Sequence, residues 1–221
     1  MNLHYAFSRQ WDDYSGWYPR QDYYNRRNEW SLSAFSRPRS LSLSYIYELP
    51  FGGGKALMGF SGWRRHLVEG WAVSGSTSFS SGEPIMLMPQ FNNTGGVVSN
   101  LRVNIVPGVN PAVSNPGPSG WFNPAAFDQP ADFSLGNAAR AYSYLTGPGS
   151  QNHDLSASKR FSLAGDKTIE FNAVALNFLN HANWNSPDTT IGPRSAPNVN
   201  AGKIIGSSGG RVLQVGLKLS F

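Results

Sequence analysis

Four histidines have the broadest chemical range in this sequence: His4, His66, His153 and His181. No two of them are spaced as zinc ligands on one helix would be. His153 and Asp154 could join a distant serine in a catalytic triad, but almost any sequence permits that combination, and no nucleophile elbow is present. We therefore expect neither a metal site nor catalytic residues.

A glycine-rich run has the composition of a phosphate-binding loop but not its spacing. Gly52, Gly53 and Gly54 are contiguous, and Ala56 follows Lys55 where such a loop has serine or threonine. We expect a turn here and no bound cofactor.

The composition is typical of a β protein with long polar loops. Charged residues make up only 14% of the 221 residues and aromatic residues 13%, while 24 glycines and 15 prolines supply turns. The absence of cysteine excludes a disulfide framework and a thiolate metal site. The formal charge is +5, but the basic residues are scattered, so we expect no nucleic-acid partner.

Six segments alternate between apolar and polar residues with a period of two, which predicts strands with one apolar face. They are 2–11, 38–49, 69–82, 152–163, 166–178 and 210–221. The last segment shows the pattern most clearly, and its apolar face is expected to contact lipid. That face carries Leu213, Val215, Leu217, Leu219 and the terminal Phe221.

The polar faces of these segments are rich in serine, which suits a polar lumen better than the lysine, glutamate and threonine usual on a soluble sheet. Each segment is near the roughly ten residues with which a tilted strand crosses a bilayer. The fold class predicted is therefore all-β, with antiparallel transmembrane β-barrel strands and long extracellular loops. The residues expected to line the lumen are Ser74, Ser76, Ser78, Glu170, Asn172, Gln214 and Lys218.

The connections between the segments alternate in length. A tight turn is expected at 164–165 and an intermediate link at 50–68, whereas 12–37, 83–151 and 179–209 are long and rich in Gly, Pro, Asn and Ser. Outer-membrane barrels have short periplasmic turns and longer external loops. If the C-terminus is periplasmic, every long loop falls on the outside.

Lys159 is the exception on the apolar face of segment 152–163. A lysine that faces lipid costs about 2–4 kcal/mol at the bilayer midplane and about 0–1 kcal/mol near an interface. In the orientation above, Lys159 lies toward the periplasmic end, where its long stem can reach the interface. The strand assignment is therefore kept.

Aromatic residues fall into two groups. Those near strand ends fit interfacial girdles, with packing in a soluble sheet as the alternative. They are Trp11, Tyr45, Tyr47, Trp63, Trp71 and Phe221. Those in loop 83–151 could bind a solute, or could pack the loop against itself. They are Trp121, Phe122, Phe127, Tyr142 and Tyr144.

The start of the chain lacks the basic and apolar regions of a signal peptide, and no stretch approaches the length of a membrane helix. For a membrane barrel, we therefore expect the export signal to lie in a preceding part and the chain to be a fragment.

Several stretches together resemble the C-terminal barrel of Oar-like TonB-dependent receptors, which often carry an N-terminal carboxypeptidase-regulatory-like domain. They occur in the expected order along nearly the whole chain. These stretches are 41–52, 70–75, 81–84, 121–127, 147–149, 152–156, 177–184 and 216–221.

The resemblance implies a barrel of about 22 strands with an N-terminal plug, powered from the inner membrane through TonB. Residues 1–221 would then be the C-terminal part of that barrel, in contact with outer-membrane lipid, with TonB reached through the missing part. Phe221 resembles the C-terminal signal that the barrel assembly machinery recognises.

The expected function is import of a large or scarce solute across the outer membrane, without bond chemistry. One alternative is a passive porin or structural barrel, which shares every strand signal. The other is a secreted carbohydrate-binding β-sandwich, in which the aliphatic face of 210–221 would cover a closed core.

Overall fold

The computed structural model describes residues 1–16, 20–51, 57, 63–96, 101–163 and 165–221. The expected glycine turn at 52–55 and Ala164 of the expected tight turn lie outside the described residues.

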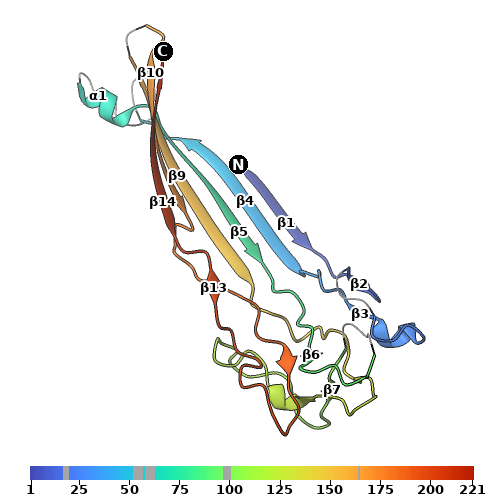
Figure 1. Cartoon of the computed structure of the whole chain (residues 1–221). Coiled ribbons are helices and arrows are strands. Elements are labelled where there is room, and N and C mark those ends of the chain that lie inside the picture. Colours follow the sequence, from blue (N-terminus) through green and yellow to red (C-terminus); the bar gives the residue numbers. More distant parts are fainter. Residues whose placement is uncertain (17–19, 52–56, 58–62, 97–100, 164) are drawn as a thin grey trace.

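Six long strands form one antiparallel sheet in which every strand pairs with the next long strand along the chain (Figure 1). They are β1 (Asn2–Phe7), β4 (Arg39–Glu48), β5 (Trp71–Ser80), β9 (Ser150–Ser162), β10 (Thr168–Leu176) and β14 (Val212–Ser220). Each overlaps one of the segments with alternating residues. The sheet is open, because β1 and β14 lie at its two edges.

The remaining elements are short and lie in the connections. The two-residue strands are β2 (Trp11–Asp12), β3 (Ser31–Leu32), β6 (Met88–Pro89), β7 (Asn104–Ile105), β8 (Phe127–Asp128), β11 (Asn183–Trp184), β12 (Thr190–Ile191) and β13 (Ser207–Ser208). The helices are α1 (Trp63–Val68) and the 3-10 turns η1 (Arg26–Glu29) and η2 (Pro124–Ala126). The first segment is thus shorter than expected: β1 ends at Phe7, and Trp11 belongs to a separate pair with β3.

The strand register gives the sheet two chemically different faces. Opposite residues of an antiparallel pair lie on the same face, and the register joins Leu41 to Phe79 and Ala173 to Val215. On the other face, serines pair with serines across β4 and β5. A slip of one residue would turn the apolar side chains to the serine face, so the alternation specifies this register.

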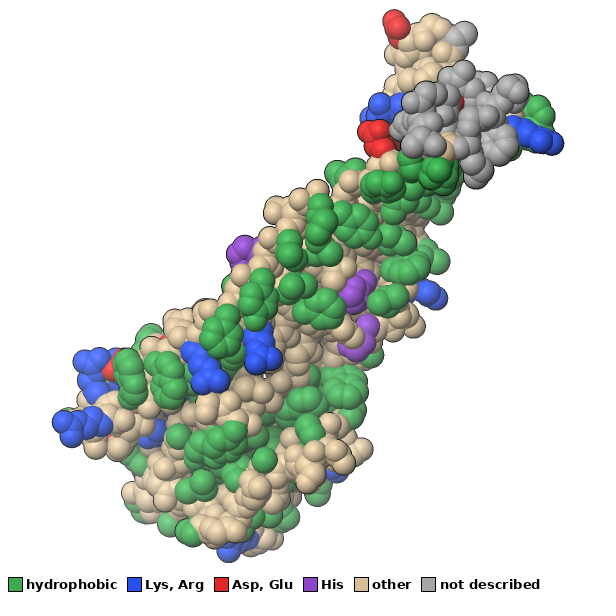
Figure 2. Space-filling model, turned by 180° about the vertical axis from the view of Figure 1, so that it is seen from behind, with side chains coloured by type: hydrophobic (Ala, Val, Ile, Leu, Met, Phe, Trp, Pro, Cys, Tyr) green, Lys and Arg blue, Asp and Glu red, His purple; other side chains and the backbone are tan. Residues whose placement is uncertain are grey.

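The apolar face of the sheet is uncovered in the described part of the chain. Val215 and Leu217 are each 73% exposed, and Leu213 and Leu219 are exposed as well. Figure 2 shows hydrophobic side chains along the length of the strands on one face. This argues against the sandwich alternative, because that fold would bury these residues under a second sheet.

The three long connections emerge at the same end of the sheet and pack together into one body, here called the cap. The cap comprises residues 8–38, 81–149 and 177–211 as far as they are described. α1 and the β9–β10 turn lie at the opposite end (Figure 1). A short parallel pair between β6 and β12 ties two of the long connections together.

The hydrophobic core lies in the cap and not under the sheet. Its residues come from the connections that follow β5 and β10, far apart in the sequence. They are Ile85, Leu87, Val103, Phe122, Ala126, Phe127, Ala138, Leu145, Ile191 and Ala201. These connections therefore form an ordered body with its own core. The sequence analysis predicted long loops here and no such core.

Candidate solute-binding cap and polar sheet face

The residues expected to line a lumen share one face of the sheet. Ser74, Ser76 and Ser78 lie on β5, Glu170 and Asn172 on β10, and Gln214 and Lys218 on β14. The register places Lys218 opposite Glu170, while Gln214 lies opposite Val174. These side chains form no single pocket; they are spread over three strands of a polar surface.

Strand β9 supplies the middle of this surface, which the expected set did not include. The Ser156 hydroxyl lies 2.7 Å from the Ser74 hydroxyl. The carboxylate of Asp154 accepts hydrogen bonds from Ser76 Oγ at 3.2 Å and Asn152 Nδ2 at 2.8 Å. The alternation of residues along segment 152–163 predicts that Asp154 lies on this polar face, so the sequence alone could have identified it as a lumen candidate.

His153 and Asp154 point to opposite faces because they are neighbours on one strand. On the apolar side, His153 Nδ1 lies 3.1 Å from the Thr77 hydroxyl, and the imidazole packs edge-on against Phe79 with ring centroids 5.2 Å apart. The two side chains therefore cannot act on the same substrate atom as a catalytic pair.

Lys159 lies on the apolar face, as expected, but its ammonium group does not extend into solvent. Its side chain is buried, with the residue 3% exposed. Nζ donates to the carbonyl oxygens of Leu67 at 2.9 Å and Glu69 at 2.6 Å, and it lies 4.8 Å from the centre of the Phe161 ring. The expectation that its stem reaches the membrane interface is corrected: the end of α1 and the link from α1 to β5 supply the acceptors for the ammonium.

A buried arginine anchors the first connection to the second within the cap. Arg140 forms an ion pair with Asp12, donates to the Asp12 carbonyl at 2.7 Å, and donates to the Ser15 hydroxyl at 2.8 Å. Burial raises the pKa of Asp12, but the hydrogen bonds from Arg140, Ser33 and Ser15 and the Arg140 charge outweigh it, so the pKa lies below its ordinary value. Asp12 is therefore held as a carboxylate.

A second buried arginine also joins the first connection to the second. Arg102 Nη2 lies 3.2 Å from the carboxylate of Glu29, and Nη1 donates to the Asn28 carbonyl at 2.5 Å. Burial lowers the pKa of Arg102, with the Glu29 charge opposing that shift. Gln21 forms two further hydrogen bonds: its side-chain oxygen accepts from Arg102 N at 2.7 Å, and its side-chain nitrogen donates to the Gly136 carbonyl at 3.0 Å. Together these contacts hold the first and second connections of the cap to each other.

The aromatic residues of the second connection divide by burial. Phe122 and Phe127 are 1% and 3% exposed and belong to the cap core, so both pack the connection against itself. Phe127 also lines the cavity described below, whereas Phe122 does not. Trp121 packs edge-on against Trp184, and its indole nitrogen donates to the Thr146 carbonyl at 2.7 Å.

The two tyrosines of this group remain partly accessible. Tyr142 is half-buried, and Tyr144 is 56% exposed beside it, with ring centroids 5.2 Å apart. Burial raises the pKa of Tyr144, so it stays a neutral phenol. Tyr144 is the member of the expected set that keeps the most ring surface for a solute.

The cap contains a cavity of about 630 Å³ that the sequence did not predict. Its walls are mainly apolar, from Val106, Val109 and Ile191, and its polar groups include Arg194 and Asn198. Arg194 Nε lies 3.0 Å from the Asp128 carboxylate. An apolar cavity of this size with few polar groups is typical of a small-molecule site, and its residues come from connections too distant in sequence for a local pattern to reveal.

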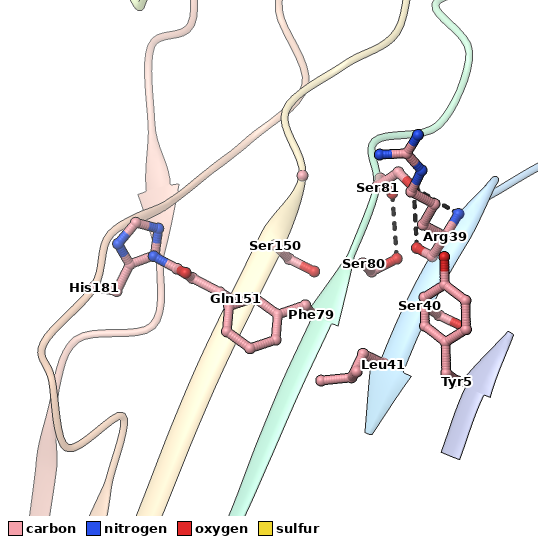
Figure 3. A pocket seen from close by; sticks show the side chains of 11 residues that line it. Tyr5, Arg39, Ser40, Leu41, Phe79, Ser80, Ser81, Ser150, Gln151 and His181 are labelled. Carbon is pink, nitrogen blue, oxygen red and sulfur yellow. Dashed lines mark hydrogen bonds between the residues drawn. The ribbon is translucent and has the colours of Figure 1, made fainter. Parts of the chain in front are cut away.

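A second hollow of about 520 Å³ lies where the sheet meets the cap (Figure 3). Tyr5, Leu41 and Phe79 form its apolar floor, and Arg39 and His181 lie at its margin. It opens on the apolar side of the sheet, since the register places these three floor residues on that face.

No metal centre is found among the described residues, where no three His, Cys, Asp or Glu side chains gather as metal ligands would. Of the helices that the structure describes, none is long and apolar enough to cross a membrane.

Comparison with known proteins gives one match. No curated protein and no solved structure matches the chain. Residues 1–214 match the family described as outer membrane beta barrel domain, a stretch that includes the cap, the first five long strands and the start of β14. The two-faced antiparallel sheet with its long connections at one end has the features of such a barrel. The chain therefore belongs to the outer membrane beta barrel domain family, and its place is the outer membrane.

Proposed function

We propose that this chain is the C-terminal barrel region of a TonB-dependent transporter of the Oar-like kind, importing a large or scarce solute. The observation that carries the proposal is the sheet itself, with an exposed aliphatic face and a serine-rich face opposite. The ordered resemblance described above and the folded cap add support for a transporter over a structural barrel.

The apolar face of the sheet contacts lipid in this proposal. In water, exposed aliphatic side chains on β14 would leave a large hydrophobic patch, which is rare on soluble monomers. In a bilayer the same surface contacts the lipid acyl chains. The backbone N–H and C=O groups of the inner strands form hydrogen bonds with the neighbouring strands.

The polar face lines the transport path. Serine hydroxyls, Asp154 and Asn152 offer short hydrogen-bonding groups along β5 and β9 without bulky side chains. The cap stands at the external end, where its cavity and Tyr144 would meet the solute first. The open edges β1 and β14 pair with further strands, because six strands are fewer than the eight of the smallest known barrels.

Single cysteines test the assignment of the two faces, because the chain has no cysteine of its own. Gln214→Cys and Val215→Cys are adjacent on β14 and differ only in face. In intact outer membranes we expect a water-soluble maleimide to label Gln214→Cys and not Val215→Cys, and a lipid-soluble maleimide to do the reverse. Equal labelling of both by the water-soluble reagent would contradict a lipid-facing surface, and protection of Val215→Cys from both reagents would favour the closed sandwich.

Energy dependence separates the transporter from the passive porin. The complete gene product, returned to a deletion strain, should support solute uptake that stops when the proton gradient is collapsed or TonB is deleted. Uptake that persists under both conditions would make the barrel a passive porin.

A further inference from the structure

The hollow at the sheet–cap junction has a fixed geometry. Ser81 holds the start of β4: its hydroxyl accepts from Arg39 N at 2.8 Å and donates to the Arg39 carbonyl at 2.9 Å (Figure 3). At the other end, Asn177 adopts the left-handed conformation and bonds the backbone of His181 at 2.9 and 2.8 Å. Two separate devices therefore place Arg39 and His181 at opposite ends of the hollow.

The Arg39 side chain has no counter-charge in the part of the chain that the structure describes. None of the residues lining it is acidic, and the Arg39 guanidinium makes no ion pair or hydrogen bond with the residues that the structure describes. The neighbouring Arg37 differs, since Glu83 neutralises it at 2.7 Å. The hollow thus presents an unneutralised cation beside the apolar floor formed by Tyr5, Leu41 and Phe79.

The location of the hollow favours a membrane component over a solute. It opens on the face assigned to lipid, at the level where the strands give way to the cap, and Figure 2 shows basic side chains at this boundary beside the hydrophobic surface. A cation next to exposed apolar surface matches the junction of a lipid, where an anionic headgroup meets acyl chains.

We propose that this hollow binds a phosphate-bearing anionic lipid of the outer leaflet. Arg39 donates to the phosphate, Gln151 and His181 offer hydrogen bonds to the linkage or hydroxyl groups, and the first acyl segments lie on the apolar floor. Arginine suits this role because its planar guanidinium can donate two parallel hydrogen bonds to phosphate. The inference rests on the proposed function, because it takes the apolar face as the lipid face and the cap as external.

Native mass spectrometry can test the site on the complete gene product, purified in a neutral detergent and titrated with phosphatidylglycerol or phosphatidylcholine. We expect tighter binding of phosphatidylglycerol, and a loss of roughly ten-fold in that affinity for Arg39→Ala because a charge-assisted contact is removed. Arg39→Lys should retain part of the affinity as a point charge. Lys203→Ala is the matched control: it removes an exposed cation of the cap that does not line the hollow.

Leu41→Ala tests the floor, because it shortens an acyl contact and leaves the charge in place. It should weaken phosphatidylglycerol binding and leave any binding of inorganic phosphate unchanged. The lipid site is overturned if Arg39→Ala binds phosphatidylglycerol like the parent, or if inorganic phosphate at the same concentration displaces the lipid, which would indicate a site for free anions.

The proposed function has its own readout in the same preparation. A folded barrel migrates differently on a gel before and after heating, and it fractionates with outer membranes. Correct folding and fractionation with no effect of Arg39→Ala would remove the lipid site alone. Failure to fractionate with outer membranes would remove both proposals.

Discussion

Replacing Val215 with arginine puts a charge on the apolar face near the middle of β14. Val215 is the fourth of nine residues in that strand and is 73% exposed. Its partner across the ladder is Ala173, which offers no counter-charge. A lipid-facing arginine at the midplane costs about 2–4 kcal/mol. Folding into bilayers should therefore become less favourable by roughly 30- to 700-fold in the equilibrium constant.

The matched control is Gln214→Arg, which adds the same charge one residue earlier and on the polar face. A surface substitution of that kind should change the free energy of folding by no more than about 0.5 kcal/mol. The assay is urea-dependent folding of the complete gene product into phospholipid vesicles, with the folded fraction read from heat-dependent gel mobility. Equal effects of both arginines, or a neutral Val215→Arg, would refute the lipid-facing assignment, because an arginine exposed to water is tolerated.

Three further changes address the cap. Phe122→Ala empties a fully buried site and should destabilise the cap by about 3–5 kcal/mol, seen as faster proteolysis of the cap with the sheet intact; unchanged protease resistance would contradict the assigned core. The folded pKa of Asp12 lies below its ordinary value of 3.8, so its stabilisation is complete above that value and is lost as pH falls from there through the folded pKa. The protection of cap amides against hydrogen exchange, taken relative to the intrinsic rate at each pH, should therefore fall in acid, and Asp12→Asn should remove this dependence; the same acid response in Asp12→Asn would assign it to another group. Gly82→Ala would place a methyl group 1.8 Å from the Gly147 carbonyl oxygen, so the junction must shift, and a loss of about 1–3 kcal/mol is expected in a thermal melt; an unaltered melting temperature would contradict this close approach.

The candidate sites show which kinds of residue a sequence can reveal. The side chains on the polar face were predictable because alternation along a strand is a local property. Burial in the cap was not, since Phe122 and Tyr144 belong to one aromatic cluster in the sequence and differ from 1% to 56% in exposure. What separates them is packing against connections that begin far away along the chain.

The sequence by itself determined the six strands, their two faces and the three long connections, because a period of two and loop composition are written in adjacent residues. Only the tertiary structure decided the contacts between distant segments. The Arg140–Asp12 pair joins residues 128 positions apart, and Lys159 finds its acceptors about 90 positions earlier, at Leu67 and Glu69. No local pattern encodes such partners, because a buried charge takes whichever acceptors the folded chain brings within hydrogen-bond distance.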